Sequence, residues 1–260
     1  RRRRISRVKI LSRGDRIRPG VYVVRARFAR SVLLLDAVQR AMFVVDRSIG
    51  AGPLNLVVAD PAAFATRESL AIPRQSQAPR FDSALTRQDR AARARLLRVL
   101  ASALPRHAPT ESLVSLFFPA KSLPRLQGAR DALFRRAFAD FAAGRLAAGV
   151  RLIRGCGEGL TPSGDDFLCG WMLALRLRGN VAPISAILKH ARGRNAVSNA
   201  FLEISAQGRV NVAVKRLLQA PSAARVKAVC AFGHSSGADL LCGMLWGLEQ
   251  NSEFRIQNSE

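Results

Sequence analysis

Two short segments of this chain carry residue types that could bind a ligand or move a proton. They are residues 163–170 (SGDDFLCG) and 236–243 (SGADLLCG), and six of their eight positions are identical. Each copy follows a loop of glycine and hydroxyl residues and leads into an apolar stretch, which predicts a loop that opens a buried helix. Two related helix starts in one chain suggest that both contribute to a single site.

A helix start of this kind suits an anion. Glycine N–H groups and side-chain hydroxyls can approach a ligand closely there, and the helix dipole favours negative charge. Phosphate and carboxylate groups are therefore the expected ligands. The residues expected to bind substrate are Gly157, Gly159, Thr161, Ser163, Gly164, Asp165, Ser235, Ser236 and Gly237.

Three residues are candidates for catalysis: His234, Asp166 and Asp239. His234 stands in the second loop beside two serines, where an imidazole could act as an acid, a base or an anion contact near neutral pH. The alternative is a loop histidine that is hydrogen-bonded to backbone. Asp166 and Asp239 occupy the same position of the two motifs.

The serines and aspartates also have a purely structural interpretation. Each motif has the S-x-x-D spacing of a capping box, as in Ser163 with Asp166, in which the two side chains satisfy N–H groups at a helix start. In a second register of the first copy, Thr161 is the cap and Pro162 takes the first helical position. The spacing leaves both registers open.

Metal and cofactor motifs are not prominent. The sequence has no His-x-x-x-His zinc pair and no Walker loop. We expect neither a metal ion nor a cofactor, and no covalent serine chemistry. One alternative is a magnesium ion held by the carboxylates of Asp165, Asp166 and Asp239.

The first part of the chain has the pattern of short strands rich in Val, Leu and Phe, separated by Asp, Gly and Pro signals. These strands predict a small antiparallel sheet or barrel. The segment that follows lacks periodicity and is interrupted by prolines, which predicts a connecting loop. The expected strands are residues 21–28, 31–35, 41–45 and 54–58.

The rest of the chain has helical patterns. The predicted fold class is α+β, with a small β-rich N-terminal part over residues 1–60, a connecting loop over 61–85 and a larger helical domain with both motifs over 86–260. Both motif helices are apolar on every side, and Gly170 and Gly243 would let their backbones cross closely. The expected helices are residues 87–104, 123–142, 144–154, 164–178, 184–190, 197–207, 210–218, 222–231 and 237–250.

The formal net charge of +24 would ordinarily suggest nucleic acid or an anionic membrane as a partner. The arginines are spread along almost the whole chain, and no aromatic residues are interleaved with the basic run at 87–98, so we interpret that run as a solvated helix face. We expect no membrane partner, and the spread of the arginines argues against nucleic acid as the partner. No apolar stretch has bilayer length and no signal-peptide pattern follows the basic start, which favours a cytoplasmic location. The four cysteines fit neither a metal pattern nor a disulfide framework and are expected to be free.

Two phrases of the chain resemble a known family. They are residues 159–168 (GLTPSGDDFL) and 233–237 (GHSSG) followed by Asp239, and together they resemble the AllH-type subunits of oxamate carbamoyltransferase over about residues 144–250. The positions shared with that family's motifs are Thr161, Ser163, Gly164, Asp165, Asp166, His234, Ser235, Ser236, Gly237 and Asp239.

The resemblance implies a role in carbamoyl transfer during the breakdown of purine (allantoin) nitrogen, in which oxalurate and phosphate become oxamate and carbamoyl phosphate. It implies other carbamoyltransferase subunits as partners, and a small anionic substrate such as carbamoyl phosphate, oxamate or oxalurate. Two alternatives stay open. One is a non-catalytic scaffold or regulatory subunit of the same complex, in which the motifs only cap helices, and the other is a basic nucleic-acid-binding protein.

Overall fold

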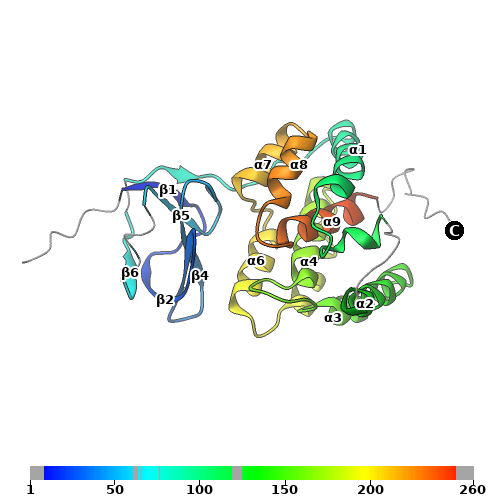
Figure 1. Ribbon diagram of the computed structural model, residues 1–260, viewed down its shortest axis with the longest axis horizontal. Coiled ribbons are helices and arrows are strands. Elements are labelled where there is room, and N and C mark those ends of the chain that lie inside the picture. Colours follow the sequence, from blue (N-terminus) through cyan, green and yellow to red (C-terminus); the bar gives the residue numbers. More distant parts are fainter. Residues whose placement is uncertain (1–8, 61–63, 65, 76, 119–124, 250–260) are drawn as a thin grey trace, which may run out of the picture. The chain divides into compact units, whose positions relative to one another are not determined.

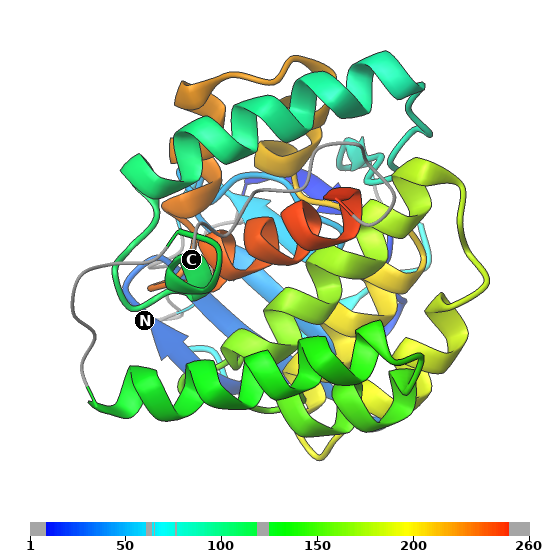
Figure 2. The ribbon, with the colours of Figure 1, turned by 90° about the vertical axis from the view of Figure 1, so that its right-hand side faces the viewer.

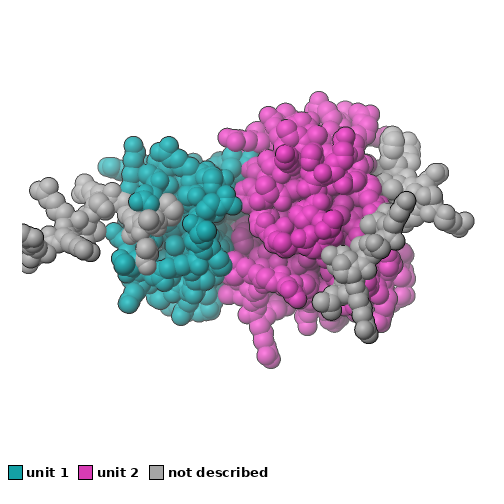
Figure 3. All heavy atoms as spheres, viewed as in Figure 1, with its two compact units in different colours: residues 1–84, 209–212 teal, residues 85–208, 213–260 magenta. Residues whose placement is uncertain are grey.

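A computed structural model describes residues 9–60, 64, 66–75, 77–118 and 125–249 of the chain (Figure 1). The chain divides into two compact units, coloured separately in Figure 3. The first contains residues 1–84 and 209–212 and holds the strands, and the second contains residues 85–208 and 213–260 and holds the helices. The expected α+β class with the β part first is confirmed.

Within the described residues, seven strands form one sheet in the order β6-β2-β3-β4-β5-β1-β7. Neighbouring strands are antiparallel except for β4 with β5 and β1 with β7, which are parallel. The prediction of a purely antiparallel sheet is wrong at these two pairs. Short connections between strands suggest that neighbours in the chain pair in the sheet, but here the order of the strands in the sheet differs from their order in the chain. The strands are β1 (Ile10–Gly14), β2 (Gly20–Phe28), β3 (Ser31–Asp36), β4 (Ala41–Val45), β5 (Asn55–Val58), β6 (Ser69–Ile72) and β7 (Arg80–Phe81).

The predicted connecting loop at 61–85 contains two of these strands. β6 pairs with β2, with Gly20 opposite Ile72, and β7 pairs with β1, with Arg13 opposite Arg80. Both strands are short and largely exposed, so they lack the apolar alternation by which a strand is recognised. Residues 61–63, 65 and 76 of this segment lie outside the described residues.

One face of the sheet packs around Tyr22, which is almost fully buried. Its hydroxyl donates to the carbonyl of Arg18, and burial raises the pKa of this phenol. Alternate residues of β2, β3, β4 and β5 surround it, as expected for a pleated strand. This core consists of Ile17, Tyr22, Val32, Leu34, Met42, Val44, Leu56, Val58, Phe64 and Ile72.

The predicted helices are confirmed to within a few residues, and a short 3-10 helix, η2, was not predicted. Residues 123, 124 and 250 of two expected helices lie outside the described residues. No helix of the described chain is both long and apolar enough to span a bilayer. The helical elements are α1 (Arg90–His107), η2 (Leu113–Leu116), α2 (Arg125–Ala142), α3 (Leu146–Ile153), α4 (Ser163–Arg178), α5 (Ile184–Ala191), α6 (Ala196–Ala206), α7 (Val212–Gln219), α8 (Ala223–Cys230) and α9 (Ser236–Glu249).

The two motif helices, α4 and α9, pack directly against each other through glycine. A Cβ atom added to Gly170 would lie 1.9 Å from the carbonyl oxygen of Leu240, and one added to Gly243 would lie 1.9 Å from that of Phe167. Only glycine permits backbones to approach so closely. The predicted close pairing at Gly170 and Gly243 is confirmed.

The contacts between α4 and α9 advance along both helices together, so the helices run in the same direction. Gly243 contacts Phe167, and further along Gly247 contacts Trp171 and Ala174. In Figure 2, α1 and α2 flank the α4–α9 pair on two sides. From α2, the ring of Phe138 stacks on Trp246 at a centroid distance of 4.2 Å. This packing fixes the direction of both helices and places both of their N-termini at one end.

Candidate functional site

The two motif loops meet at the N-terminal ends of α4 and α9. The hydroxyl oxygens of Thr161 and Ser236 lie 3.0 Å apart, although the residues are 75 positions apart in the chain. The Thr161 hydroxyl also donates to the Asp166 carboxylate at 3.0 Å. The expectation that both loops form one cluster is confirmed by these contacts.

The elements before the two loops repeat each other as well. α3 and α8 each end in a turn against the following helix, and a Cβ added to Gly164 or Gly237 would lie 1.8 or 1.9 Å from the carbonyl oxygen of Ile153 or Val229. The N–H groups of these two glycines donate to backbone carbonyls of the same turns, at 2.8 and 3.1 Å. Gly164 and Gly237 therefore serve close packing, and their N–H groups are already used within the protein.

The predicted capping boxes are not formed. Pro162 is the N-cap of α4 and makes no side-chain capping bond, so Ser163 lies inside the first turn and Thr161 outside it. In α9 the N–H of Asp239 donates to the carbonyl of Ser235, which takes the position of Pro162. Both registers considered for α4 are wrong, because the serine and aspartate side chains find partners across the helix pair.

The aspartates are exchanged between the two motifs. Asp166 of the first motif interacts with the hydroxyl of Ser236, and Asp239 of the second interacts with the hydroxyl of Ser163. The parallel direction and close approach of α4 and α9 bring the first turn of each helix within reach of the other. The site is therefore built from both copies and neither copy can form it alone.

Burial dominates the electrostatics of this cluster. Asp166 is 7% exposed and Asp239 is 0% exposed. Burial holds the pKa of Asp166 well above its ordinary value, and the nearby charge of Asp239 raises it further. Burial also raises the pKa of Asp239, against the opposing effects of the Leu113 N–H and the Ser163 hydroxyl. Burial therefore disfavours the charged form of both carboxyl groups.

Asp239 is bonded unequally through its two oxygens. Its Oδ1 atom accepts from the N–H of Leu113 at 2.7 Å. The hydroxyls of Ser163 and Ser235 stabilise the charged carboxylate. Among the described residues, however, no donor makes a hydrogen bond of normal geometry to its buried Oδ2 atom. One acceptor position of Asp239 is thus left for a proton or a ligand.

Asp165 bonds to the start of the first loop. Its Oδ1 atom accepts from the N–H of Gly155 at 2.8 Å, and the buried Ser198 hydroxyl acts on it without a hydrogen bond of normal geometry. Burial raises the pKa of Asp165 despite these donors. The side chain holds the start of the glycine loop, and its charge contributes to raising the pKa of Asp166.

The remaining loop glycines, Gly157 and Gly159, lie on the exposed part of the first loop. Both have positive φ, 116° and 94°, which favours glycine. A Cβ at Gly157 would come within 2.8 Å of the Ser163 nitrogen, whereas none of the surrounding atoms lies within 4 Å of a Cβ at Gly159. Gly157 shapes the loop over Ser163, and Gly159 leaves space beside it.

His234 lies at the surface of the second loop. Its side chain is 81% exposed, and its Nε2 atom is 2.9 Å from a carboxylate oxygen of Glu111. The backbone N–H of Glu111 itself, then the Thr110 hydroxyl and the nearby His234, lower the pKa of the Glu111 carboxyl. His234 is therefore partnered by a carboxylate, and the bonding to backbone that was considered from the sequence is not its described contact.

Residues 233–237 (GHSSG) also have the Gly-x-Ser-x-Gly spacing of a hydrolase nucleophile elbow. That motif requires a strand before the serine. Here the helix α8 precedes it, and the Ser235 hydroxyl interacts with Asp239. The local structure does not form an elbow.

Comparison with known proteins adds one result. Residues 153–248 match the model of a family described as oxamate carbamoyltransferase subunit AllH. The resemblance expected from the two motifs is thereby confirmed, and the family description supports a subunit of an oxamate carbamoyltransferase. No curated protein and no solved structure matches the chain.

The AllH match begins at the end of α3 and ends near the end of α9, so it contains every residue of the polar cluster that comes from the motifs. It does not contain Glu111 and Leu113, which contact the cluster, or Arg130, which lies behind them. Sequence reasoning missed these residues. The one sequence feature that could have indicated them is Asp131, a charged residue at a core position of α2, where it is fully buried.

No group of three His, Cys, Asp or Glu side chains in the described part of the chain is arranged to hold a metal ion. Asp165, Asp166 and Asp239 are therefore not arranged as a set of magnesium ligands, and the magnesium alternative has no geometric support. All four cysteines are free thiols, and burial raises the pKa of Cys230 to about 11. These thiols have the character of small core residues.

Proposed function

We propose that the chain is a subunit of a carbamoyltransferase of the oxamate type, and that the polar cluster at the N-termini of α4 and α9 binds the carbamoyl-bearing substrate. The observation that carries the proposal is the contact between Thr161 and Ser236, which unites both motifs of the AllH-matched region in one cluster. Two helix starts with the same direction also add their positive dipole ends at this point.

The donors and acceptors of the cluster fit a carbamoyl group. Such a group presents N–H donors and a carbonyl acceptor. A carboxyl pair that holds one proton offers a carboxylate for the N–H groups and an acidic O–H for the carbonyl, and Asp166 and Asp239 have raised pKa values that support this state. The half-buried hydroxyls of Thr161, Ser235 and Ser236 add groups that donate or accept.

The reaction requires few groups from the protein. When phosphate attacks the carbamoyl carbon of oxalurate, a C–O bond forms, the C–N bond to the oxamate nitrogen breaks, and that nitrogen takes up a proton. Hydrogen-bond donors aimed at the carbonyl oxygen stabilise the charge that develops there. In this proposal Asp166 and Asp239 supply the donor and the proton, and His234 contacts the anionic part of the ligand or carries a proton to solvent.

The anionic ligand would approach the exposed side of the cluster. Gly157 and Gly159 with Thr161 form one edge, and Ser235, Ser236 and His234 form the other. The binding residues proposed from the sequence divide here into two groups. Gly164, Gly237 and Asp165 shape the loops from behind, and the others remain proposed contacts.

A second candidate is a non-catalytic scaffold subunit of the same complex. The burial of Asp239 and the internal use of the Gly164 and Gly237 N–H groups favour it, because both are expected of a cluster that only stabilises helix starts. Other carbamoyltransferase subunits are partners under either candidate.

Reconstitution with the partner subunits separates the two. The rate of carbamoyl phosphate formation from oxalurate and phosphate is measured with the wild-type chain, with Thr161→Val and Ser236→Ala, and with Ser185→Ala on the exposed side of α5 as the control. We expect the two motif variants to lose about tenfold or more in kcat/KM and the control to match wild type. Motif variants that assemble and turn over like wild type would establish the scaffold role.

A further inference from the structure

One short segment outside the two motifs contacts both Asp239 and His234 of the second motif. This segment, residues 111–113, donates the N–H of Leu113 to Asp239 Oδ1 at 2.7 Å. It also places the Glu111 carboxylate 2.9 Å from the Nε2 atom of His234. Asp239 and His234 are thus oriented by the same three residues.

The pseudo-symmetry of the two motifs shows what the segment replaces. In the first motif, the Asp166 carboxylate accepts a hydrogen bond from the hydroxyl of Thr161, in its own loop, at 3.0 Å. The corresponding position of the second loop is His234, which is turned outward to Glu111. Leu113 supplies the missing donor through its backbone. The second half of the site therefore depends on a part of the chain that the motifs do not contain.

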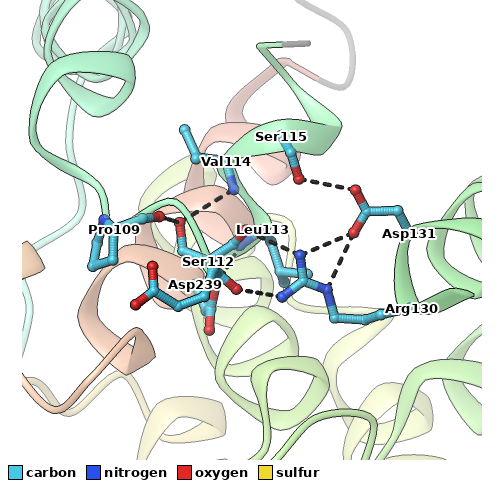
Figure 4. A network of polar contacts seen from close by, with 9 residues as sticks. Pro109, Ser112, Leu113, Val114, Ser115, Arg130, Asp131 and Asp239 are labelled. Carbon is cyan, nitrogen blue, oxygen red and sulfur yellow. Dashed lines mark hydrogen bonds and ion pairs between the residues drawn. The ribbon is translucent and has the colours of Figure 1, made fainter. Parts of the chain in front are cut away.

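Arg130 holds this segment in place (Figure 4). Its guanidinium donates to the carbonyl oxygen of Ser112 at 3.1 Å and also to that of Glu111. A planar guanidinium carries donors on three nitrogens in a fixed fork, so it can hold two successive carbonyls and a carboxylate at once, whereas an ammonium group has all its donors on one nitrogen. The orientation of the next peptide, which carries the Leu113 N–H, follows from this.

Asp131 in turn fixes Arg130. Its Oδ1 atom accepts from Arg130 at 2.9 and 3.1 Å, and its Oδ2 atom accepts from the Ser115 hydroxyl of η2 at 2.9 Å. Asp131 is fully buried and the Arg130 side chain is 12% exposed. A buried ion pair costs desolvation and is weak support for stability alone. The bonds from Arg130 to two backbone carbonyls indicate that the pair orients the 111–113 backbone.

We propose that Arg130 and Asp131 are positioning residues: they hold residues 111–113 so that Leu113 fixes the Asp239 carboxylate and Glu111 fixes His234. Neither residue contacts the cluster through a hydrogen bond of its own. The consequence for turnover rests on the proposed function, whereas the consequence for Asp239 itself does not.

The test therefore uses two readouts, the turnover of the reconstituted complex and the titration of the Asp239 carboxyl followed by ¹³C NMR in the isolated chain. Besides burial, the groups that act on the pKa of Asp239 are the Leu113 N–H, the Ser163 and Ser235 hydroxyls and the Arg130 charge. The Asp239 charge in turn raises the pKa values of Asp166, Cys230 and Cys242, which are the other titratable groups that face it. The Leu113 N–H and the Arg130 charge both favour the ionised form.

In Arg130→Gln we expect the Asp239 titration to move to higher pH and kcat to fall about tenfold or more, with KM changed less. Arg130→Lys keeps the charge and should recover part of the titration but not the turnover, because one nitrogen cannot hold both carbonyls and the Asp131 carboxylate in the geometry of the guanidinium. The matched control is Arg135→Gln, an exposed arginine on the same helix, which should leave both readouts at their wild-type values.

If Arg130→Gln does not fold, the Asp239 titration and the turnover of Arg130→Lys are compared with those of wild type to test the positioning role. Folded variants with lower melting temperature but wild-type Asp239 titration and turnover would overturn the positioning role. If the wild-type complex shows no carbamoyl transfer, the proposed function fails, and the titration alone then confirms or overturns the positioning of Asp239.

Discussion

The hydroxyl oxygens of Thr161 and Ser236 lie 3.0 Å apart although 75 positions separate the two residues in the chain. Each belongs to a different copy of the repeated motif, and each contacts the same carboxylate, Asp166. The contact exists because α4 and α9 run in the same direction and begin at the same level. It is the point at which the two copies become one site.

The first prediction concerns this contact. In a double-mutant cycle of Thr161→Val and Ser236→Ala, the two losses in the free energy of unfolding should fail to add by about 0.5–1.5 kcal/mol, because the first substitution already removes the bond. Urea unfolding of the four chains measures the coupling. The cycle of Thr161→Val with Ser185→Ala is the control and should be additive. Additivity in both cycles would mean that the hydroxyl contact is not formed in solution.

The second prediction concerns the glycines between the motif helices. Gly170→Ala and Gly243→Ala should each lower the free energy of unfolding by about 2 kcal/mol or more, because the new Cβ would meet a backbone carbonyl oxygen at 1.9 Å. Gly128→Ala in α2 is the control, since a Cβ there has no other atom within 4 Å. It should stabilise the chain by about 0.5–1 kcal/mol. Chemical denaturation checks all three, and tolerance of either alanine would contradict the close parallel pairing.

The third prediction concerns the buried Asp166. Its pKa is raised by burial, so the folded state binds the proton more tightly than the unfolded state, and the contribution of this group to stability is lost as pH rises from about 4 through the folded pKa. Asp166→Asn removes the titration. The difference in melting temperature, variant minus wild type, should therefore increase by about 2 °C or more between pH 4 and pH 8.

Ser185→Ala, on the exposed side of α5, serves as the control for Asp166→Asn, because it changes no titrating group. Its melting temperatures should follow those of wild type at every pH. Parallel curves for Asp166→Asn and wild type would show that Asp166 is ionised in the folded chain at neutral pH and would remove the shared proton from the proposed mechanism.

The fourth prediction concerns His234. In the reconstituted complex, His234→Ala should lower carbamoyl transfer by about 10²-fold with little change in melting temperature, because the side chain is 81% exposed and contributes little packing. His190→Ala in α5 lies outside both motifs and should be silent in both measurements. A variant of His234 that turns over like wild type would place the proton carrier on another subunit.

Much of the fold follows from local patterns in the sequence. The strands at 21–28, 31–35, 41–45 and 54–58 and the α-helices of the described chain were predicted, because apolar periodicity and turn residues act over a few positions. The close pairing at Gly170 and Gly243 was predicted too, since two all-round apolar helices with a glycine at the same position have one obvious way to pack. The short exposed strands β6 and β7 were missed because their own residues have no strand pattern. They are extended because they pair with β2 and β1.

The composition of the site was decided by the tertiary structure. The sequence by itself determined that serine and aspartate stand at two equivalent helix starts, and from spacing alone each pair was interpreted as a cap. Whether Asp166 bonds to its own serine or to Ser236 depends on the direction in which the two helices lie, which local spacing does not contain. The donation from Leu113 to Asp239 and the hold of Arg130 on residues 111–113 are likewise long-range contacts, formed only when α2 and η2 fold against α9.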